Sequence, residues 1–221
     1  MNILAIDSAT EACSAALLRA DGEVFGEFAV APRQHTSLLP QMMERVLAAA
    51  DLSKSMLTHC AFCNGPGAFT GIRIAAAQAQ GIGLGLGIPL LPISTLAALA
   101  QTSLDRYPYD STLVALDARM QEIYWAVYRR DHEGCAQLDG IERLSGIGEL
   151  RDPVTVESGA GHGWLAELRA GLDLPIDHEL LPDARSLLKL AQQAVRQQRS
   201  CSPSQVRINY LRNQVAEKAR S

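Results

Sequence analysis

The alternation of apolar and polar positions predicts strands at the start of the chain. Short apolar runs at residues 3–7, 13–18 and 23–30 are separated by turn residues, which is typical of β-structure. Asp21-Gly22, between the second and third runs, is a hairpin signal. We therefore expect the fold to begin with an antiparallel meander.

A helical period follows over residues 36–50, with Thr36 or Ser37 as the N-cap and Pro40 in the first turn. Its apolar positions form one wide stripe, made up of Leu38, Leu39, Met42, Met43, Val46 and Leu47. Such a stripe is ordinarily core, but its width and its two methionines also suit an adaptable contact with a second protein. We predict that the stripe binds a partner where it is not covered by the sheet.

A second helix is predicted after a buried strand at residues 58–63 and a glycine-rich loop, and it should end near Gly81. Small residues recur at every fourth position of this helix and form a ridge with little side-chain bulk: Gly71, Ala75, Ala79 and Gly83. Another helix could approach this ridge at the short end of normal interaxial distances. The stripe and the ridge together predict a partner-binding surface, for which burial of about 800 Å² per partner would suffice.

The second half of the chain repeats the pattern of the first. After a strand at residues 88–93 and a helix from Ser94 or Thr95 to about Leu104, Val114-Ala115-Leu116-Asp117 corresponds to Leu4-Ala5-Ile6-Asp7 at an offset of 110 residues. In each copy a short turn and a second strand follow, and residues 156–161 later correspond to residues 62–67. Two copies of a β-β-β-α-β-α unit predict a two-lobed α/β protein with a cleft between the lobes.

We place the lobe boundary in the segment around Pro108, which gives an N-terminal lobe over residues 1–106 and a C-terminal lobe over residues 107–221. The C-terminal tail could return to the first lobe.

Composition narrows the function classes. The 221 residues are 48% hydrophobic and 20% charged, which is typical of a globular protein with a sizeable core. Twenty Lys and Arg residues against 24 Asp and Glu residues give a net charge of −4, so the chain has no overall attraction for RNA or DNA. Five unevenly spaced cysteines indicate reduced thiols. With no secretory leader and no apolar span, we expect a cytoplasmic protein without membrane contact.

The glycine loop has two physical interpretations. No lysine follows its glycines, so it is not a Walker A loop, and Gly65-x-Gly67-x-x-x-Gly71 departs from the dinucleotide fingerprint. A strand-to-helix junction of this kind could hold an anion on free N–H groups, with Arg73 one turn further on. It could equally be a tight turn whose glycines allow close packing. The residues alone leave both interpretations open.

Hydrolase and metal chemistry find no support in the sequence. Leu39 stands where a second histidine would complete a metal pair with His35, and the other histidines show no ligand spacing. Cys60-Ala61-Phe62-Cys63 lies in a predicted strand, which favours structural thiols over a redox pair. Neither a GxSxG nor an HExxH motif occurs. We therefore predict no catalytic residue and no bound metal.

The duplicated pattern resembles the ribonuclease-H-like fold of actins, Hsp70 chaperones and sugar kinases, where nucleotide phosphates rest between the first hairpins of the two lobes. Asp7-Ser8-Ala9-Thr10 and Asp117-Ala118-Arg119-Met120 stand at these hairpins, and neither contains a glycine. Phosphate cradling needs several converging N–H groups, which glycine usually permits. We expect the chain to bind no cofactor alone, and we interpret Asp7 as a cap of its turn.

Three segments together resemble the bacterial TsaB (YeaZ) family. The most specific is the loop motif formed by Gly65, Pro66, Gly67, Phe69, Thr70, Gly71 and Arg73. His35-Thr36-Ser37-Leu38-Leu39-Pro40 precedes it, and Asp117-Ala118-Arg119 with Glu122-Ile123-Tyr124 follows it. The ending at residues 210–216 is also similar, although Ile208 and Asn209 precede Tyr210 where the family pattern would place a proline.

The resemblance implies a non-catalytic scaffold subunit in the synthesis of threonylcarbamoyladenosine on tRNA. Its implied partners are a TsaD-like catalytic subunit and a TsaE-like ATPase, with tRNA reached only through the complex. The resemblance also implies a homodimer when the protein is alone, pairing through the first two long helices, and a nucleotide could be shared at the joint with TsaD. The alternatives are an ATP-using enzyme of the actin and sugar-kinase type, and a glycoprotease-like peptidase.

Overall fold

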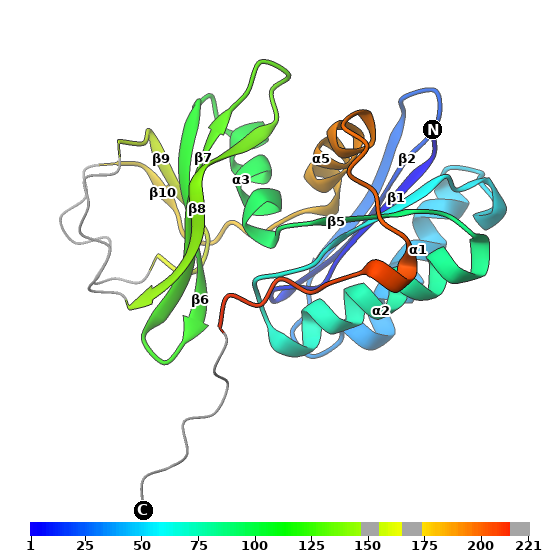
Figure 1. Cartoon of the computed structure of the whole chain (residues 1–221), viewed down its shortest axis with the longest axis horizontal. Helices are drawn as coiled ribbons and strands as arrows, with labels where there is room; N and C mark the ends of the chain where they lie inside the picture. The colour runs from blue at the N-terminus through cyan, green and yellow to red at the C-terminus, as the bar shows by residue number, and fades with distance from the viewer. Residues whose placement is uncertain (147–154, 165–173, 213–221) are drawn as a thin grey trace, which may run out of the picture.

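Two five-stranded sheets form the framework of the protein. The computed structural model describes residues 1–146, 155–164 and 174–212. The first sheet has the strand order β3-β2-β1-β4-β5, and the second has the order β10-β9-β6-β7-β8 (Figure 1). Helices lie between the two sheets and on the outer face of the first sheet.

The first sheet and its outer helices come from the first ninety or so residues of the chain. The elements are β1 (Ile3–Asp7), β2 (Ala12–Leu18), β3 (Val24–Val30), α1 (His35–Ala49), the short η1 (Lys54–Met56), β4 (His59–Cys63), α2 (Phe69–Leu86) and β5 (Leu90–Ile93). The second half contributes α3 (Thr95–Arg106), β6 (Ser111–Arg119), β7 (Glu122–Arg130), β8 (Ala136–Gly146), β9 (Ser158–Ala160), β10 (Ile176–Asp177), α5 (Ala184–Arg196) and η3 (Pro203–Gln205).

The two sheets have the same topology, which confirms the predicted duplication. β1, β2 and β3 form an antiparallel meander, and β4 and β5 add to β1 in parallel. β6, β7 and β8 form the second meander, and β9 and β10 add to β6 in parallel. The two copies therefore share the order of their strands as well as the direction of each.

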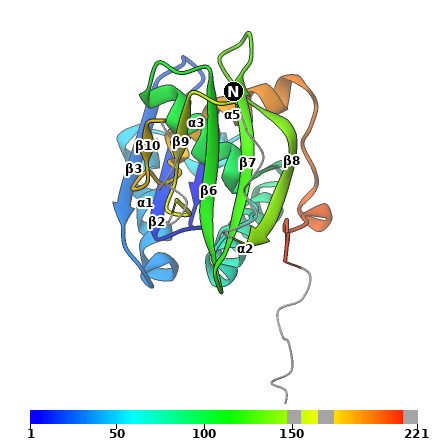
Figure 2. The same ribbon diagram turned by 90° about the vertical axis from the view of Figure 1, so that its left-hand side faces the viewer.

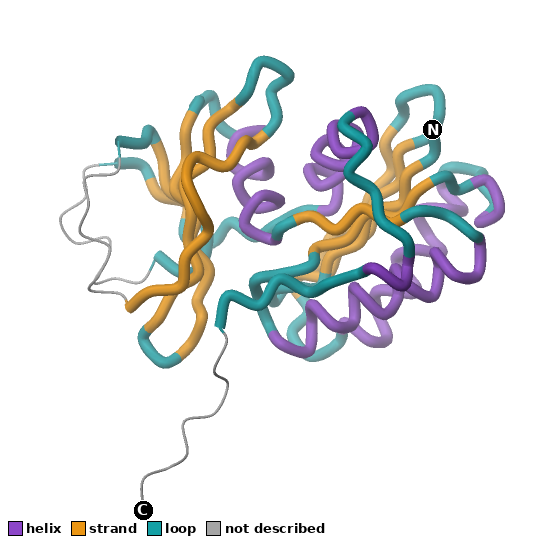
Figure 3. Tube along the Cα trace, in the orientation of Figure 1, coloured by secondary structure: helices purple, strands orange, loops and turns teal. Residues whose placement is uncertain are grey.

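The first sheet is buried on both faces because different layers cover them. Along β1, Leu4 and Ile6 contact the core shared with α1 and α2, whereas Ile3 and Ala5 contact the core between the sheets. This division follows the two-residue period of a strand. Helices α1 and α2 cover the outer face of this sheet (Figure 3).

Each of the two helices between the sheets packs on the sheet that the other half of the chain forms. α3 follows the first sheet in the chain, yet it packs against β6, β7 and β8 of the second. α5 follows the second sheet but packs against β1, β2 and the other strands of the first (Figures 1 and 2). The chain thus crosses between the layers twice, and the lobe division at residues 106 and 107 stays a prediction based on the repeat.

Several helix ends differ from the sequence prediction. α1 begins at His35 with Gln34 at its N-cap and no capping side chain, so neither Thr36 nor Ser37 caps it, and Pro40 lies beyond the first turn. The His35 ring anchors this start through Nε2, 3.1 Å from the Ala12 carbonyl oxygen. α2 continues past Gly81 to Leu86, and the next residue, Gly87, adopts a left-handed conformation with φ of 67°.

No helix in the described part of the chain is long and apolar enough to cross a membrane.

The last described segment, residues 199–212, ties the two lobes together, and we call it the C-terminal strap. Cys201 exchanges two backbone hydrogen bonds of 2.9 Å with Leu90 at the edge of the first sheet. Asn209 then donates its N–H to the Asn64 carbonyl at 2.8 Å, a bond that proline at this position would lack. Arg212 reaches the Ala118 carbonyl of the second lobe at 3.1 Å. The strap therefore contacts the first sheet at Leu90 before it reaches β6 of the second sheet at Ala118.

Gly71→Ala should strongly destabilise the protein, because a Cβ there would lie 1.9 Å from the Ser8 carbonyl oxygen. We expect the free energy of unfolding to fall by about 2–3 kcal/mol, typical of overpacking that must shift backbone. Gly81→Ala in the same helix is the matched control, since its Cβ would meet nothing within 4 Å. That change should stabilise by up to about 1 kcal/mol. Urea unfolding of both variants tests this, and equal effects would contradict it.

Candidate functional site

The apolar stripe of α1 is used inside the protomer. All of its predicted members except the half-buried Leu38 are buried in the core beneath the first sheet: Leu39, Met42, Met43, Val46 and Leu47. The expectation that the stripe offers these side chains to a partner therefore needs correction. The stripe packs on β1 and β2 because this sheet needs an apolar cover on its outer face.

The small-residue ridge of α2 is also occupied by the protein's own chain. Gly71 lies against the turn after β1, and Ala75 and Ala79 are fully buried. A Cβ on Gly83 would lie 2.8 Å from Pro203 in the C-terminal strap. The ridge thus allows close approach of the sheet, the first turn and the strap rather than of a second helix.

A shallow apolar groove remains open between α1 and α2. It encloses about 380 Å³, and Met43 and Leu47 of the predicted stripe line it together with Ile82 and Leu86 of α2. Gly81 and Gly85 leave open space along it, since a Cβ on either would meet nothing within 4 Å. Leu84 of the same helix is 72% exposed. In this groove two members of the predicted stripe, Met43 and Leu47, line an open surface.

The glycine loop is built for close backbone approach. A Cβ on Gly67 would lie 2.4 Å from the Ala9 carbonyl oxygen, and one on Gly65 would lie 2.7 Å from the Asn209 carbonyl oxygen. Gly65 also has a φ of 105°, which side chains rarely tolerate. The loop is thereby held against both the first turn and the strap. These contacts account for its glycines through packing, the second of the two interpretations left open above.

The polar and aromatic residues of the loop motif point outward. Pro66 is buried, whereas Phe69, Thr70 and Arg73 are exposed. The Arg73 guanidinium lies 3.5 Å from the centroid of the Phe69 ring, and its Nε donates to the Tyr210 hydroxyl at 2.9 Å. Arg73 therefore joins the start of α2 to the strap. Tyr210 belongs to the motif near the C-terminus, of which residues 213–216 lie outside the described residues.

Asp7 caps its turn, as predicted, and is fully buried. Its Oδ1 accepts the Ala9 N–H at 2.9 Å, while Oδ2 has no hydrogen-bond partner among the described residues. Burial raises the pKa of Asp7 to about 6. Asp117 repeats the arrangement in the second lobe, where its Oδ1 accepts the Arg119 N–H at 2.7 Å.

The two first hairpins are bridged by side chains. Glu11, in the turn between β1 and β2, lies 3.0 Å from His162 Nε2 and 3.5 Å from Arg119. His162 Nδ1 accepts the Asp117 N–H at 3.0 Å, which leaves Nε2 as the protonated nitrogen facing Glu11. His162 and nearby charges lower the pKa of Glu11 to about 2. A carboxylate thus occupies the space between the hairpins.

Sequence reasoning missed this bridge. The repeat places Asp7 and Asp117 at equivalent turns, but the pairing of Glu11 with His162 depends on how the lobes are oriented. No periodic pattern carries that orientation. Only the glycines that flank His162 signalled a turn at this point.

The cysteines are thiols of the core. Cys60 and Cys63 lie on β4 and are fully buried, and burial raises the pKa of Cys60 to about 12. In the part of the chain that the structure describes, Asp131, Glu133 and Cys135 are the ligand-type residues that cluster. Their carboxylates are engaged by backbone N–H groups, Gln193 and Arg196. The cluster serves to join the turn after β7 to α5.

The duplicated topology and the paired aspartate turns define the class of protein. It is an α/β protein of the ribonuclease-H-like, two-lobed class that includes actins and sugar kinases. The family model described as "TsaD: tRNA N6-adenosine threonylcarbamoyltransferase" matches residues 29–175.

Full-length relatives narrow this to one family. The tRNA threonylcarbamoyladenosine biosynthesis protein TsaB of Escherichia coli is 37% identical, with 99% of this chain and 97% of that protein covered. The protein of the same name from Haemophilus influenzae is 32% identical, and the match covers 99% of this chain and 96% of that protein. The solved structure titled "YeaZ from Pseudomonas aeruginosa" superposes with a TM-score of 0.89 at 35% identity, and the match covers 95% of this chain and 99% of that chain. The chain belongs to the TsaB (YeaZ) family.

Asp7→Asn should stabilise the protein at neutral pH. The folded-state pKa of about 6 lies above the ordinary aspartate value of 3.8. The stability that the protonated carboxyl supports is therefore complete below pH 4 and is lost as pH rises through 6. Asparagine keeps the Oδ1 acceptor without the charge. We expect a gain of about 3 kcal/mol at pH 7 and little difference at pH 4.

Urea unfolding between pH 4 and pH 7 measures this difference. Asp117→Asn is the matched control. It makes the same change in the equivalent turn of the second half, where the carboxyl is only partly buried. A gain from Asp7→Asn that stayed constant over this pH range would contradict the assignment.

Proposed function

We propose that this protein is a non-catalytic subunit in the biosynthesis of threonylcarbamoyladenosine on tRNA. It completes and positions a TsaD-like catalytic subunit and works with a TsaE-like ATPase. The single observation that carries the proposal is the full-length likeness to TsaB of Escherichia coli, which is named for this pathway. The match to the TsaD family model is consistent with pairing between two proteins of related fold.

The space between the first hairpins supports a scaffold over an ATP-using enzyme. Enzymes of the actin and sugar-kinase type need converging N–H donors there for phosphate. Here Glu11 presents a carboxylate held by His162 and Arg119, which would repel a phosphate. The turns also lack glycine. Any nucleotide that the complex uses would therefore be expected at the joint with the partner, and not in the crevice of this chain.

The groove between α1 and α2 supports a protein partner. Its walls are largely apolar, its glycines leave room for inserted side chains, and Leu86 adds exposed apolar surface to its lining. Glu44 and Lys54 form an ion pair at the same groove. An apolar centre with a charged rim is the usual anatomy of a protein interface. We place both the homodimer and the TsaD-like partner on this surface.

Reconstitution tests the function directly. Purified protein should restore threonylcarbamoyl transfer to tRNA when it is added to the TsaD-like and TsaE-like proteins of the same organism. Omitting it should lower the rate by at least about tenfold, a loss of about 1.4 kcal/mol in transition-state stabilisation. The chain alone should neither transfer the group nor hydrolyse ATP. Full transfer in its absence would overturn the proposal.

Gly85→Arg should block the groove without unfolding the protein, since its Cβ faces open space. We expect self-association and binding to the TsaD-like subunit to weaken by at least about tenfold, as for removal of an interface hot spot. Analytical ultracentrifugation and co-purification measure both. Ile141→Arg, at a 64% exposed position on β8, is the control and should change neither. Unchanged association of Gly85→Arg would remove the groove from the proposal.

A further inference from the structure

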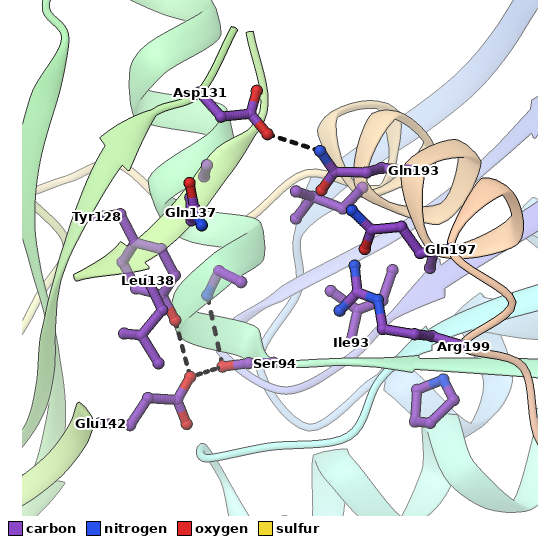
Figure 4. A pocket seen from close by; sticks show the side chains of 15 residues that line it. Ile93, Ser94, Tyr128, Asp131, Gln137, Leu138, Glu142, Gln193, Gln197 and Arg199 are labelled. Atoms are coloured by element: carbon purple, nitrogen blue, oxygen red, sulfur yellow. Dashed lines mark hydrogen bonds between the residues drawn. The ribbon is translucent and has the colours of Figure 1, made fainter. Parts of the chain in front are cut away.

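A second cavity lies between the lobes, away from the bridged hairpins. It encloses about 490 Å³ and is lined from both sides of the molecule, by α5 and the strap on one side and by β7 and β8 on the other. This volume is within the range of small-molecule sites, which often occur where two lobes meet. Figure 4 shows Arg199 and Glu142 reaching into it from opposite sides.

Glu142 is held in place by three neutral donors. Ser94 Oγ and Tyr128 OH donate to Oε1, the latter at 2.8 Å, and Asn209 Nδ2 donates to Oε2 at 2.8 Å. A carboxylate has about four acceptor positions, so one remains open on Oε2. No cation of residues 1–146, 155–164 and 174–212 pairs with Glu142. The carboxylate is therefore fixed by its donors, with one acceptor position left for a further donor.

Arg199 supplies the opposite charge. It lies at the start of the strap, and among the described residues no carboxylate pairs with its guanidinium. Each of the two groups thus lacks a counter-ion within the described structure, while both line the same cavity. Asp131, also in the lining, gives the cavity a second carboxylate. Two carboxylates and one guanidinium disfavour a purely anionic ligand such as a phosphate ester.

We propose that this cavity binds a small zwitterion of amino-acid or dipeptide size. Its carboxylate would pair with Arg199, for which the guanidinium offers a bidentate fork. Its ammonium would take the open acceptor position of Glu142. The apolar lining, which includes Ile93, Leu138 and Leu190, would receive the carbon skeleton. This inference is independent of the proposed function, because it uses neither the α1–α2 groove nor the first hairpins.

Saturation-transfer NMR on the full chain tests the site with four probes. These are pooled neutral L-amino acids, pooled neutral dipeptides, butylamine as the cation alone and butyrate as the anion alone. We expect saturation transfer to at least one zwitterion pool and none to butylamine or butyrate. The pool that responds defines the size of the ligand. The proposal would be overturned if neither zwitterion pool showed saturation transfer, or if butyrate showed as much as the zwitterions.

Two substitutions with matched controls locate the binding. Arg199→Met and Glu142→Gln should each weaken binding of the zwitterion by at least about tenfold, as expected for loss of a charged hydrogen bond. The controls change exposed residues and should leave binding of the zwitterion unchanged. They are Arg207→Met, on the same strap, and Glu179→Gln. The Arg199 guanidinium makes no hydrogen bond or ion pair within the described structure, so Arg199→Met should fold even if Glu142→Gln does not. Undiminished binding by Arg199→Met would overturn the proposal.

Discussion

The constraint on which this structure depends is that each sheet must cover its inner face with a helix from the other half of the chain. α3 packs on the second sheet and α5 on the first, so neither half closes its own core. A sheet with an uncovered apolar face would expose far more surface than a small domain can tolerate. The relative position of the lobes, and with it the cavity lined by Arg199 and Glu142, follows from this exchange.

The sequence predicts local structure well and the relations between distant segments poorly. The strands and their duplication were predicted because apolar periodicity and turn residues specify them, as Asp7 and Asp117 show. The end of α2 was placed too early because its glycines lower helix propensity, whereas packing of Gly83 against the strap extends it. The exchange of α3 and α5 left no periodic signal.

The predicted partner surface shows the same limit for the site. Apolar spacing predicted the positions of both helices but could not show which face of each helix the sheet would use. The stripe containing Leu39 and Met42 covers the sheet, and the groove between the helices is the surface that we propose for a partner. The glycine motif was recognised by its pattern, but its meaning lay in backbone contacts with Ala9 and Asn209, which are far away in sequence.

The strap has a consequence for the order in which the chain can fold during synthesis. Cys201 pairs with the edge of the first sheet, and α5 fills the inner face of that sheet. The amino-terminal sheet therefore keeps one apolar face uncovered until α5, at Ala184–Arg196, has left the ribosome. A nascent chain of this protein should depend on chaperone protection for longer than one whose first domain is self-sufficient.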